Sequence, residues 1–284
     1  MATLRTETVA GVRVITLDRP DEYNTINPTL REELADALDT ADRDAEVHAV
    51  LLRAEGPAFC AGYGLDWATP GAADSPRERT WDSVMDVQMI GRFAETWSKL
   101  HTISKPTIAA VQGWCIGGGT NMVLHADMIV CSRSAKFGYP PMRVWGIPEA
   151  PWVWVARLGL ERAKRFLFTG DEINGEDAAR FGLVLECVDD DELDAHARAL
   201  ATRVAQLPVN QLQMIKWALN ETAREMYAPD TSRLLGCLFD GVARHTQEGL
   251  DFVRRANDVG FRQAVRERDD PFADYGSRPR GDRG

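Results

Sequence analysis

The sequence predicts an α/β fold with parallel strands joined by crossover helices. Strand-like segments alternate with segments of helical periodicity up to about residue 190. From there to about residue 268 the pattern is helical only. We therefore expect one domain: a core at residues 1–190, a helical C-terminal subdomain at residues 191–268, and a flexible polar tail at residues 269–284.

The individual elements follow from local patterns. Residues 12–19 alternate and are rich in β-branched residues, which predicts a strand. A helix should follow, because Asn27 is a suitable N-cap and Pro28 suits the first helical position. The other predicted strands cover residues 49–56, 106–115, 127–133 and 181–189, and further helices are predicted at residues 77–103 and directly after the glycines at residues 117–119.

Composition and charge exclude several classes of protein. The 284 residues are 44% hydrophobic and 27% charged, with a net charge of −10, which argues against binding to nucleic acid or to an anionic membrane. The N-terminus lacks the apolar region of a signal peptide, and no apolar run is long enough to span a bilayer. The five cysteines are scattered, so the sequence predicts a cytoplasmic protein with reduced thiols and no metal site.

Two glycine-rich segments are candidates for a functional site. The triple glycine "GGG" follows a predicted strand and opens a helix, where backbone N–H groups can approach an anionic ligand closely. The alternative is a tight turn with close packing. The segment "FCAGYG" at residues 59–64 also follows a strand, and two N–H donors from such loops form an oxyanion hole if they converge on one oxygen.

Five sequence blocks, taken together, carry a family resemblance. They read "LDRPDEYNTIN", "GPAFCAGYGL", "KPTIAAVQGWCIGGGTNMVLHADMIV", "AKFGYPPMRVWGIP" and "LFTGDEINGEDAARFGLV", and in order and spacing they resemble the crotonase, or enoyl-CoA hydratase/isomerase, family. The resemblance implies a spiral core of ββα turns with C-terminal helices that build homotrimers or hexamers. It also implies an acyl-CoA thioester substrate, no metal and no redox cofactor.

The resemblance also implies site residues. By position, the oxyanion hole of this chain would consist of the backbone N–H groups of Ala61 and Gly118. Such donors stabilise the enolate that forms beside a thioester carbonyl. Further substrate-binding positions are expected at Tyr23, Cys60, Gly62, Tyr63, Gly64 and Gly117.

Both catalytic glutamates of the family's hydratases are missing. One position holds Asn121, whose amide neither gives nor takes a proton near neutral pH, although it can orient a water. The other position holds Pro141, which offers no acid. The ordinary mechanism with two glutamates, and the isomerase mechanism that uses the second of them, are therefore not open to this chain.

Glu149 is the candidate for a replacement. Its position resembles the one where dienoyl-CoA isomerases and aryl-CoA dehalogenases carry an aspartate. Trp145, Pro148 and Trp152 flank it, so partial desolvation should raise its pKa into a range useful for acid/base catalysis. The alternative is that Glu149 caps the helix that opens at Pro151.

Other side chains near these motifs have less definite predicted roles. His125 lies one helical turn after Asn121 and is expected to be a core histidine rather than a second acid/base. Asp127 resembles a structural aspartate of the family. Five tryptophans close in sequence to the motifs indicate a bulky or aromatic acyl group, or a narrowed pocket: Trp67, Trp114, Trp145, Trp152 and Trp154.

The sequence thus predicts an enzyme that acts on an acyl-CoA through an enolate, with Glu149 as its acid/base and enoyl-CoA hydration as its first candidate reaction. Isomerisation or hydrolysis on the same fold is the nearest alternative. A non-catalytic acyl-CoA-binding protein is the alternative from another class.

Overall fold

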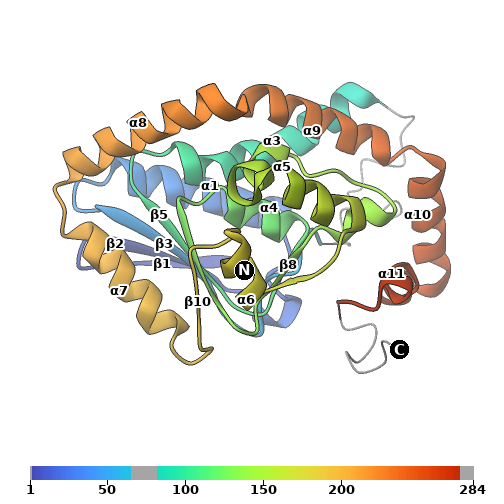
Figure 1. Ribbon diagram of the computed structural model, residues 1–284, viewed down its shortest axis with the longest axis horizontal. Helices are drawn as coiled ribbons and strands as arrows, with labels where there is room; N and C mark the ends of the chain where they lie inside the picture. The colour runs from blue at the N-terminus through green and yellow to red at the C-terminus, as the bar shows by residue number, and fades with distance from the viewer. Residues whose placement is uncertain (1, 65–81, 276–284) are drawn as a thin grey trace.

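The computed structural model describes residues 2–64 and 82–275 (Figure 1). Its strands form two sheets. The larger sheet has the order β1-β2-β3-β5-β7-β10, with β1 (Leu4–Val9), β2 (Val12–Leu17), β3 (Ala49–Ala54), β5 (Thr107–Val111), β7 (Met128–Ser132) and β10 (Glu186–Val188). The smaller sheet has the order β4-β6-β8-β9, with β4 (Ala58–Cys60), β6 (Trp114–Ile116), β8 (Lys136–Gly138) and β9 (Ile173–Asn174).

Most neighbouring strands run parallel, as the sequence predicts. The exceptions among the described strands are the hairpin β1–β2 and the pair β8–β9, which are antiparallel. From β3 to β8, successive strands alternate between the two sheets, so this part of the chain winds as a spiral of ββα turns. The mixed α/β class, the parallel sheet and the C-terminal helices are confirmed.

Helices cover both faces of the larger sheet (Figure 1). Side chains from α1 (Pro28–Arg43) and α3 (Ser83–Thr102) pack in one core with alternate residues of β2 and β3, such as Ile15 and Leu52. The intervening residues, such as Val14 and Leu51, pack on the other face against α7 (Leu193–Ala205). Burial on both faces explains why these strands read as nearly continuous apolar runs.

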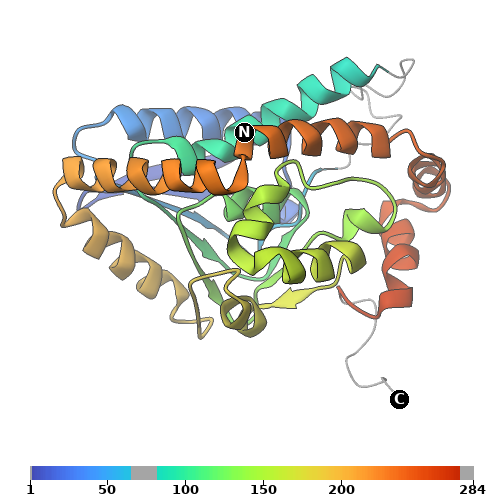
Figure 2. The same ribbon diagram turned by 45° about the horizontal axis from the view of Figure 1, so that its top comes forward.

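The remaining helices complete the fold. Within the spiral lie α4 (Gly118–Leu124), α5 (Pro151–Thr169) and α6 (Gly175–Phe181), and the C-terminal part consists of α8 (Val209–Tyr227), α9 (Pro229–Ala243), α10 (Gln247–Val259) and α11 (Phe261–Asp269). Short 3₁₀ turns occur at Pro20–Glu22, Pro140–Arg143 and Asp270–Phe272. Helix α9 packs against α3 and α5, and α10 and α11 fold over one end of the molecule (Figures 1 and 2).

Several predicted boundaries need correction. The predicted strand 106–115 is two strands in different sheets, because the chain turns at Gly113. A Cβ at Gly113 would lie 1.9 Å from the Pro57 carbonyl oxygen, so the turn requires glycine. The strand predicted at 181–189 is confined to β10, because Gly182 ends α6 in the left-handed region. Strands β1, β4, β8 and β9 were not predicted, and β4 lies in a segment that the sequence indicated as a loop.

The C-terminal segment also differs in part from the prediction of a flexible tail. Residues 269–275 are packed, since Arg143 forms ion pairs with Asp269 at 2.9 Å and Asp274 at 2.7 Å. Tyr275 donates a hydrogen bond to the Gly170 carbonyl at 2.6 Å. The rest of the predicted tail and residues 77–81 of the predicted helix 77–103 lie outside the described residues. No helix in the described part of the chain is long and apolar enough to cross a membrane.

Candidate active site

The two glycine-rich loops converge. They follow β4 and β6, which are adjacent parallel strands. A Cβ on Gly62 would lie 2.9 Å from the Ile116 carbonyl oxygen and 3.8 Å from the Gly118 nitrogen. A Cβ on Gly119 would lie 2.4 Å from the Cys60 carbonyl oxygen. Only glycine permits this approach, so these residues join the loops as well as lining a potential anion site.

One expected oxyanion donor is used elsewhere. The Ala61 N–H donates to the Tyr23 carbonyl oxygen at 3.1 Å, which corrects the prediction for Ala61. The Gly118 N–H begins α4 and has no hydrogen-bond partner among the residues described. The Gly62 carbonyl accepts from the Ile26 N–H at 2.8 Å. In a trans peptide the C=O and N–H point in opposite directions, so the Tyr63 N–H points away from Ile26.

A cavity of about 390 Å³ lies beside these loops. Five of the residues predicted for the site line it: Ala61, Gly62, Tyr63, Gly117 and Gly118. The other predicted binding positions are not among its lining residues: the Cys60 side chain and Gly64 are buried, and Tyr23 is 45% exposed elsewhere. The opposite wall comes from α9, α11 and the segment around Pro141, with Asp240, Arg244, Phe261, Arg262 and Val265.

Glu149 lies behind this cavity wall and is only 2% exposed. Its Oε1 accepts a hydrogen bond from the Tyr63 hydroxyl, and its Oε2 accepts one from the Asn121 amide. Helix α5 begins with Ala150 as its N-cap and has no side-chain cap, so the alternative in which Glu149 caps that helix is wrong. The carboxylate is instead the centre of a buried polar cluster.

The environment of Glu149 suits proton transfer. Burial raises the pKa of its carboxyl from 4.5 to about 7, and the negative charge of Asp240 adds to this effect. The hydrogen bonds from Tyr63 and Asn121 act in the opposite direction, because they stabilise the charged form. A carboxyl group with a pKa near 7 is present in both protonation states at neutral pH and can serve as base or acid.

Asn121 is fully buried and its amide is fixed. The Trp154 indole N–H donates to the Asn121 Oδ1 at 3.1 Å, which leaves the Nδ2 group facing Glu149. Asn121 therefore holds the carboxylate and does not replace the missing acid. Pro141 lies against Gly117, since a Cβ on Gly117 would be 3.6 Å from the Pro141 ring.

His125 is a buried, neutral histidine. Burial lowers its pKa from 6.5 to about 4. Its Nδ1 lies 2.8 Å from the Asn121 carbonyl oxygen, so this nitrogen carries the proton, and Nε2 has no partner among the described residues. The prediction of a core residue is supported by this geometry, because His125 contacts the backbone of Asn121 and not the carboxylate.

Sequence reasoning missed the contribution of α9. The Asp240 carboxylate accepts from the Ile147 N–H at 3.1 Å and pairs with Arg244 at 2.8 Å, and both side chains line the cavity. In the sequence, the only indication of this pair was the spacing of four residues between Asp240 and Arg244 in a segment predicted to be helical. Such pairs are common on helix surfaces and do not by themselves indicate a site. Tyr139 also lines the cavity and donates to the Ile147 carbonyl at 3.0 Å.

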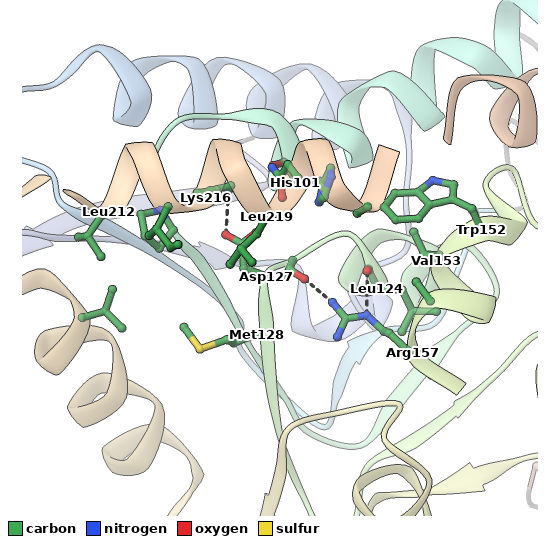
Figure 3. Close-up of a pocket in the computed structure, with 17 residues that line it drawn as sticks. His101, Leu124, Asp127, Met128, Trp152, Val153, Arg157, Leu212, Lys216 and Leu219 are labelled. Atoms are coloured by element: carbon green, nitrogen blue, oxygen red, sulfur yellow. Dashed lines mark hydrogen bonds and ion pairs between the residues drawn. The ribbon is translucent and has the colours of Figure 1, made fainter. Parts of the chain in front are cut away.

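The tryptophans do not form one cluster. Trp114 and Trp145 line the cavity, whereas Trp154 is fully buried behind Asn121. Trp152 lines a different cavity (Figure 3). Trp67 lies outside the described residues. Of the tryptophans close in sequence to the motifs, Trp152 and Trp154 therefore do not line this cavity.

The second cavity, of about 490 Å³, lies between α8, β7 and the start of α5 (Figure 3). Its polar groups pair with one another: Lys216 lies 2.8 Å from Asp127, and Arg157 donates to the Leu124 carbonyl at 3.0 Å. Asp127 also accepts from the Thr107 N–H at 2.7 Å, which fits its predicted structural role. Within the described residues, no three His, Cys, Asp or Glu side chains are grouped so as to hold a metal ion.

Converging glycine loops beside a cavity, with a buried carboxyl group behind its wall, point to the class of protein: an enzyme of the ββα-spiral fold. Comparison with known proteins agrees. The family model for enoyl-CoA hydratase/isomerase matches residues 7–255. The chain belongs to this family, and its fold is the crotonase fold.

Individual relatives differ in their named reactions. The crystal structure of an enoyl-CoA hydratase from Mycobacterium smegmatis has a TM-score of 0.90 and 42% identity, covering 97% of this chain and 96% of that one. A probable enoyl-CoA hydratase of Rhodobacter capsulatus is 32% identical over 77% of this chain and 81% of its own length. The 1,2-epoxyphenylacetyl-CoA isomerase of Escherichia coli is 30% identical over 74% of this chain and 79% of its own.

Proposed function

We propose that this protein acts on an acyl-CoA thioester through an enolate, with Glu149 as the general acid/base. The observation that carries the proposal is the state of Glu149: its carboxyl group is buried, accepts a hydrogen bond from Tyr63 of the cavity wall, and has a pKa of about 7. A purely structural carboxylate is normally ionised and paired with a cation, whereas the partners of Glu149 are a phenol and an amide.

The converged loops would supply the oxyanion hole. The Gly118 N–H is one donor, and the Tyr63 N–H replaces Ala61 as the second, because its peptide group points away from Ile26. Negative charge develops on the thioester oxygen when the neighbouring carbon loses or gains a proton. One well-placed donor typically lowers such a barrier by about 3 kcal/mol.

Hydration is the first reaction we propose. Glu149 would accept a proton from water as the oxygen adds to the β-carbon of a 2-enoyl-CoA, and the enolate electrons would settle on the thioester oxygen. The proton would then return to the α-carbon, so that water is added across the double bond. A single carboxyl group suffices, because it gives back the proton that it takes.

Isomerisation is the second candidate, and the similarity to a Delta(3,5)-Delta(2,4)-dienoyl-CoA isomerase of Dictyostelium discoideum favours it. In such a reaction Glu149 would remove a proton from one carbon and return it to another, again through the enolate. The phenylacetyl group in the name of the E. coli relative, and Trp114 and Trp145 in the cavity wall, favour a bulky or aromatic acyl group. A carrier that binds acyl-CoA without turnover is the remaining alternative.

The substrate's coenzyme A group, the cofactor requirement, the cellular location and the oligomeric state are proposals as well. We propose that coenzyme A is part of the substrate, that the reaction needs no metal or redox cofactor, and that the protein works in the cytoplasm. Homotrimers or hexamers are proposed because large apolar side chains are exposed on α8 and α9, including Trp217, Met226, Leu234 and Phe239. Analytical ultracentrifugation measures this association directly.

Turnover of 2-enoyl-CoA thioesters tests the proposal. Short, long and aromatic 2-enoyl-CoAs are mixed with the purified protein, and loss of the enoyl-thioester absorbance is followed together with product analysis. Glu149→Gln should lose turnover and keep its affinity for the thioester. The matched control is Glu33→Gln, because Glu33 is half-buried and hydrogen-bonded to Thr3 on another side of the core.

Each result has a definite meaning. Loss of turnover in Glu149→Gln alone supports catalysis by Glu149. Product with a shifted double bond identifies an isomerase. Tight binding without chemistry on any thioester, unchanged in Glu149→Gln, would identify a carrier and contradict the proposed enzyme.

A further inference from the structure

We propose that the Tyr63 hydroxyl carries the proton between Glu149 and the substrate. This inference rests on the proposed function, and it makes Tyr63 a catalytic residue. The proposal is based on the separation of the Glu149 carboxylate from the cavity. The carboxylate is enclosed by protein, and Tyr63 both lines the cavity and is hydrogen-bonded to Glu149.

The carboxylate has no open side in the described structure. Its two oxygens accept hydrogen bonds from Tyr63 and Asn121, and its backbone lies against Gly236 of α9. Neither Glu149 nor Asn121 is among the described residues that line the cavity, whereas Tyr63 is. A proton moving directly between Glu149 and a thioester in the cavity would have to pass the Tyr63 side chain.

The Tyr63 ring is held in place for this task. A Cβ on Gly118 would lie 2.6 Å from the Tyr63 Cε2 atom, so the ring lies directly on the glycine that we propose as an oxyanion donor. Phe93 also packs against the Tyr63 ring in an edge-on arrangement, with ring centroids 5.2 Å apart. The ring therefore borders the space where the thioester oxygen would lie, and its hydroxyl points to Glu149.

The relay conserves protons and electrons. In deprotonation, the α-carbon–hydrogen bond breaks and its proton forms a bond to the Tyr63 oxygen. The original hydroxyl proton of Tyr63 moves to Glu149 Oε1 at the same time, and the electron pair left on carbon delocalises onto the thioester oxygen. Reprotonation runs the same steps backwards. Tyr63 ends each step as a neutral phenol, and Glu149 stores the proton.

The groups around the pair fit this division of roles. Burial and the charge of Glu149 raise the pKa of Tyr63 well above 10, so the phenol passes a proton on without holding a lasting charge. Tyr139, the other buried phenol here, donates to the Ile147 carbonyl and not to Glu149.

The rival explanation is that Tyr63 only positions Glu149. Tyr63→Phe distinguishes a proton relay from a positioning role, because phenylalanine keeps the ring on Gly118 and the backbone N–H but removes the hydroxyl. The readout is exchange of the α-protons of butyryl-CoA, octanoyl-CoA and phenylacetyl-CoA with D₂O, followed by NMR across pH 5 to 9. This exchange reports proton transfer even where the net reaction is unknown.

The relay predicts that Tyr63→Phe slows exchange at every pH by about 10²-fold or more, with unchanged thioester affinity. Glu149→Gln should do the same, and the double variant should be little worse than either single one. Tyr139→Phe, which removes a hydroxyl from the same wall but leaves the Tyr63–Glu149 pair intact, should slow exchange far less.

Other outcomes separate the two proposals. If Tyr63→Phe keeps its maximal exchange rate and only shifts its midpoint to higher pH, Tyr63 is a positioning residue and the relay is overturned. That shift is expected because the Tyr63 hydrogen bond lowers the pKa of Glu149, while Asp240 and Arg244 from α9 and Asn121 from α4 remain unchanged. If Glu149→Gln exchanges normally, or the wild type exchanges no α-proton, the proposed function fails and the relay fails with it.

Discussion

The Trp154 indole N–H donates to the Asn121 Oδ1 at 3.1 Å, and this contact decides what Asn121 does. An amide has one accepting and one donating end, so a donor on its oxygen turns the nitrogen toward Glu149. Asn121 is thus a hydrogen-bond donor to the buried carboxyl group of Glu149.

Asn121→Asp should move the pH dependence of the reaction upward. The substitution replaces a donor by a second carboxyl group against Glu149, and two adjacent carboxyl groups resist double ionisation. We expect the pH at which kcat/KM reaches half its maximum, as the catalytic carboxyl group loses its proton, to lie above the wild-type value, which should be near 7. The measurement is a pH profile of kcat/KM on the best thioester found.

The control for this charge change is Asn27→Asp. Asn27 caps α1 through a hydrogen bond from the Leu30 N–H at 2.8 Å and is not among the described residues that line the cavity, and aspartate is an equally good cap. Its pH profile should match the wild type. An unshifted midpoint in Asn121→Asp would show that Glu149 does not control the profile.

Much of the fold could be predicted because its strands and helices have local signatures. The N-cap Asn27 and the parallel strands buried on both faces are examples. The turn at Gly113 could not be predicted, because its cause is the Pro57 carbonyl, which lies far away in sequence. Strand β1 was missed because five of its six residues are exposed and carry no apolar alternation.

The site could be predicted only where a residue has a local signature in the sequence. Glu149 could be chosen because its position resembles that of an aspartate in some members of the family and because its neighbours in sequence are apolar, and its burial agrees. Its partner Tyr63 lies 86 residues away, and only the fold brings the two together. The role of Asp240 depends on the way α9 folds back over the core, which no local pattern encodes.

Gly118→Ala should cripple catalysis while leaving most of the fold intact. A Cβ at this position would lie 2.6 Å from Tyr63 Cε2 and 2.9 Å from Ile26 Cδ1, so the Tyr63 ring must move. Displacement of a catalytic group by about 1 Å typically costs about 10²-fold in rate, so we expect at least that loss in kcat. Steady-state kinetics and a thermal melt measure both effects.

Gly91→Ala is the matched control. Gly91 lies within α3, and a Cβ there meets no atom within 4 Å. Alanine should stabilise the helix by up to about 1 kcal/mol and leave the kinetics unchanged. Wild-type kcat in Gly118→Ala would mean that the contact between the Tyr63 ring and Gly118 has no catalytic role.

Stability should depend on pH through Glu149 in an unusual direction. The pKa of Glu149 is about 7 in the folded protein and near 4.5 in the unfolded chain, so the folded state binds more protons between these values. Its contribution is complete below pH 4.5 and is lost as pH rises through 7, by about 3 kcal/mol. His125, with its pKa lowered from 6.5 to about 4, has the opposite effect and partly hides this loss below pH 6.5.

The difference between wild type and Glu149→Gln isolates this effect, because His125 is common to both proteins. Urea unfolding at a series of pH values from 5 to 8 should show the variant gaining stability relative to wild type as pH rises. Glu33→Gln should show no such gain, since burial raises the pKa of Glu33 but hydrogen bonds from Thr3 lower it on balance. A pH-independent difference for Glu149→Gln would mean that Glu149 stays ionised in the folded protein, and would remove the basis for its role as an acid.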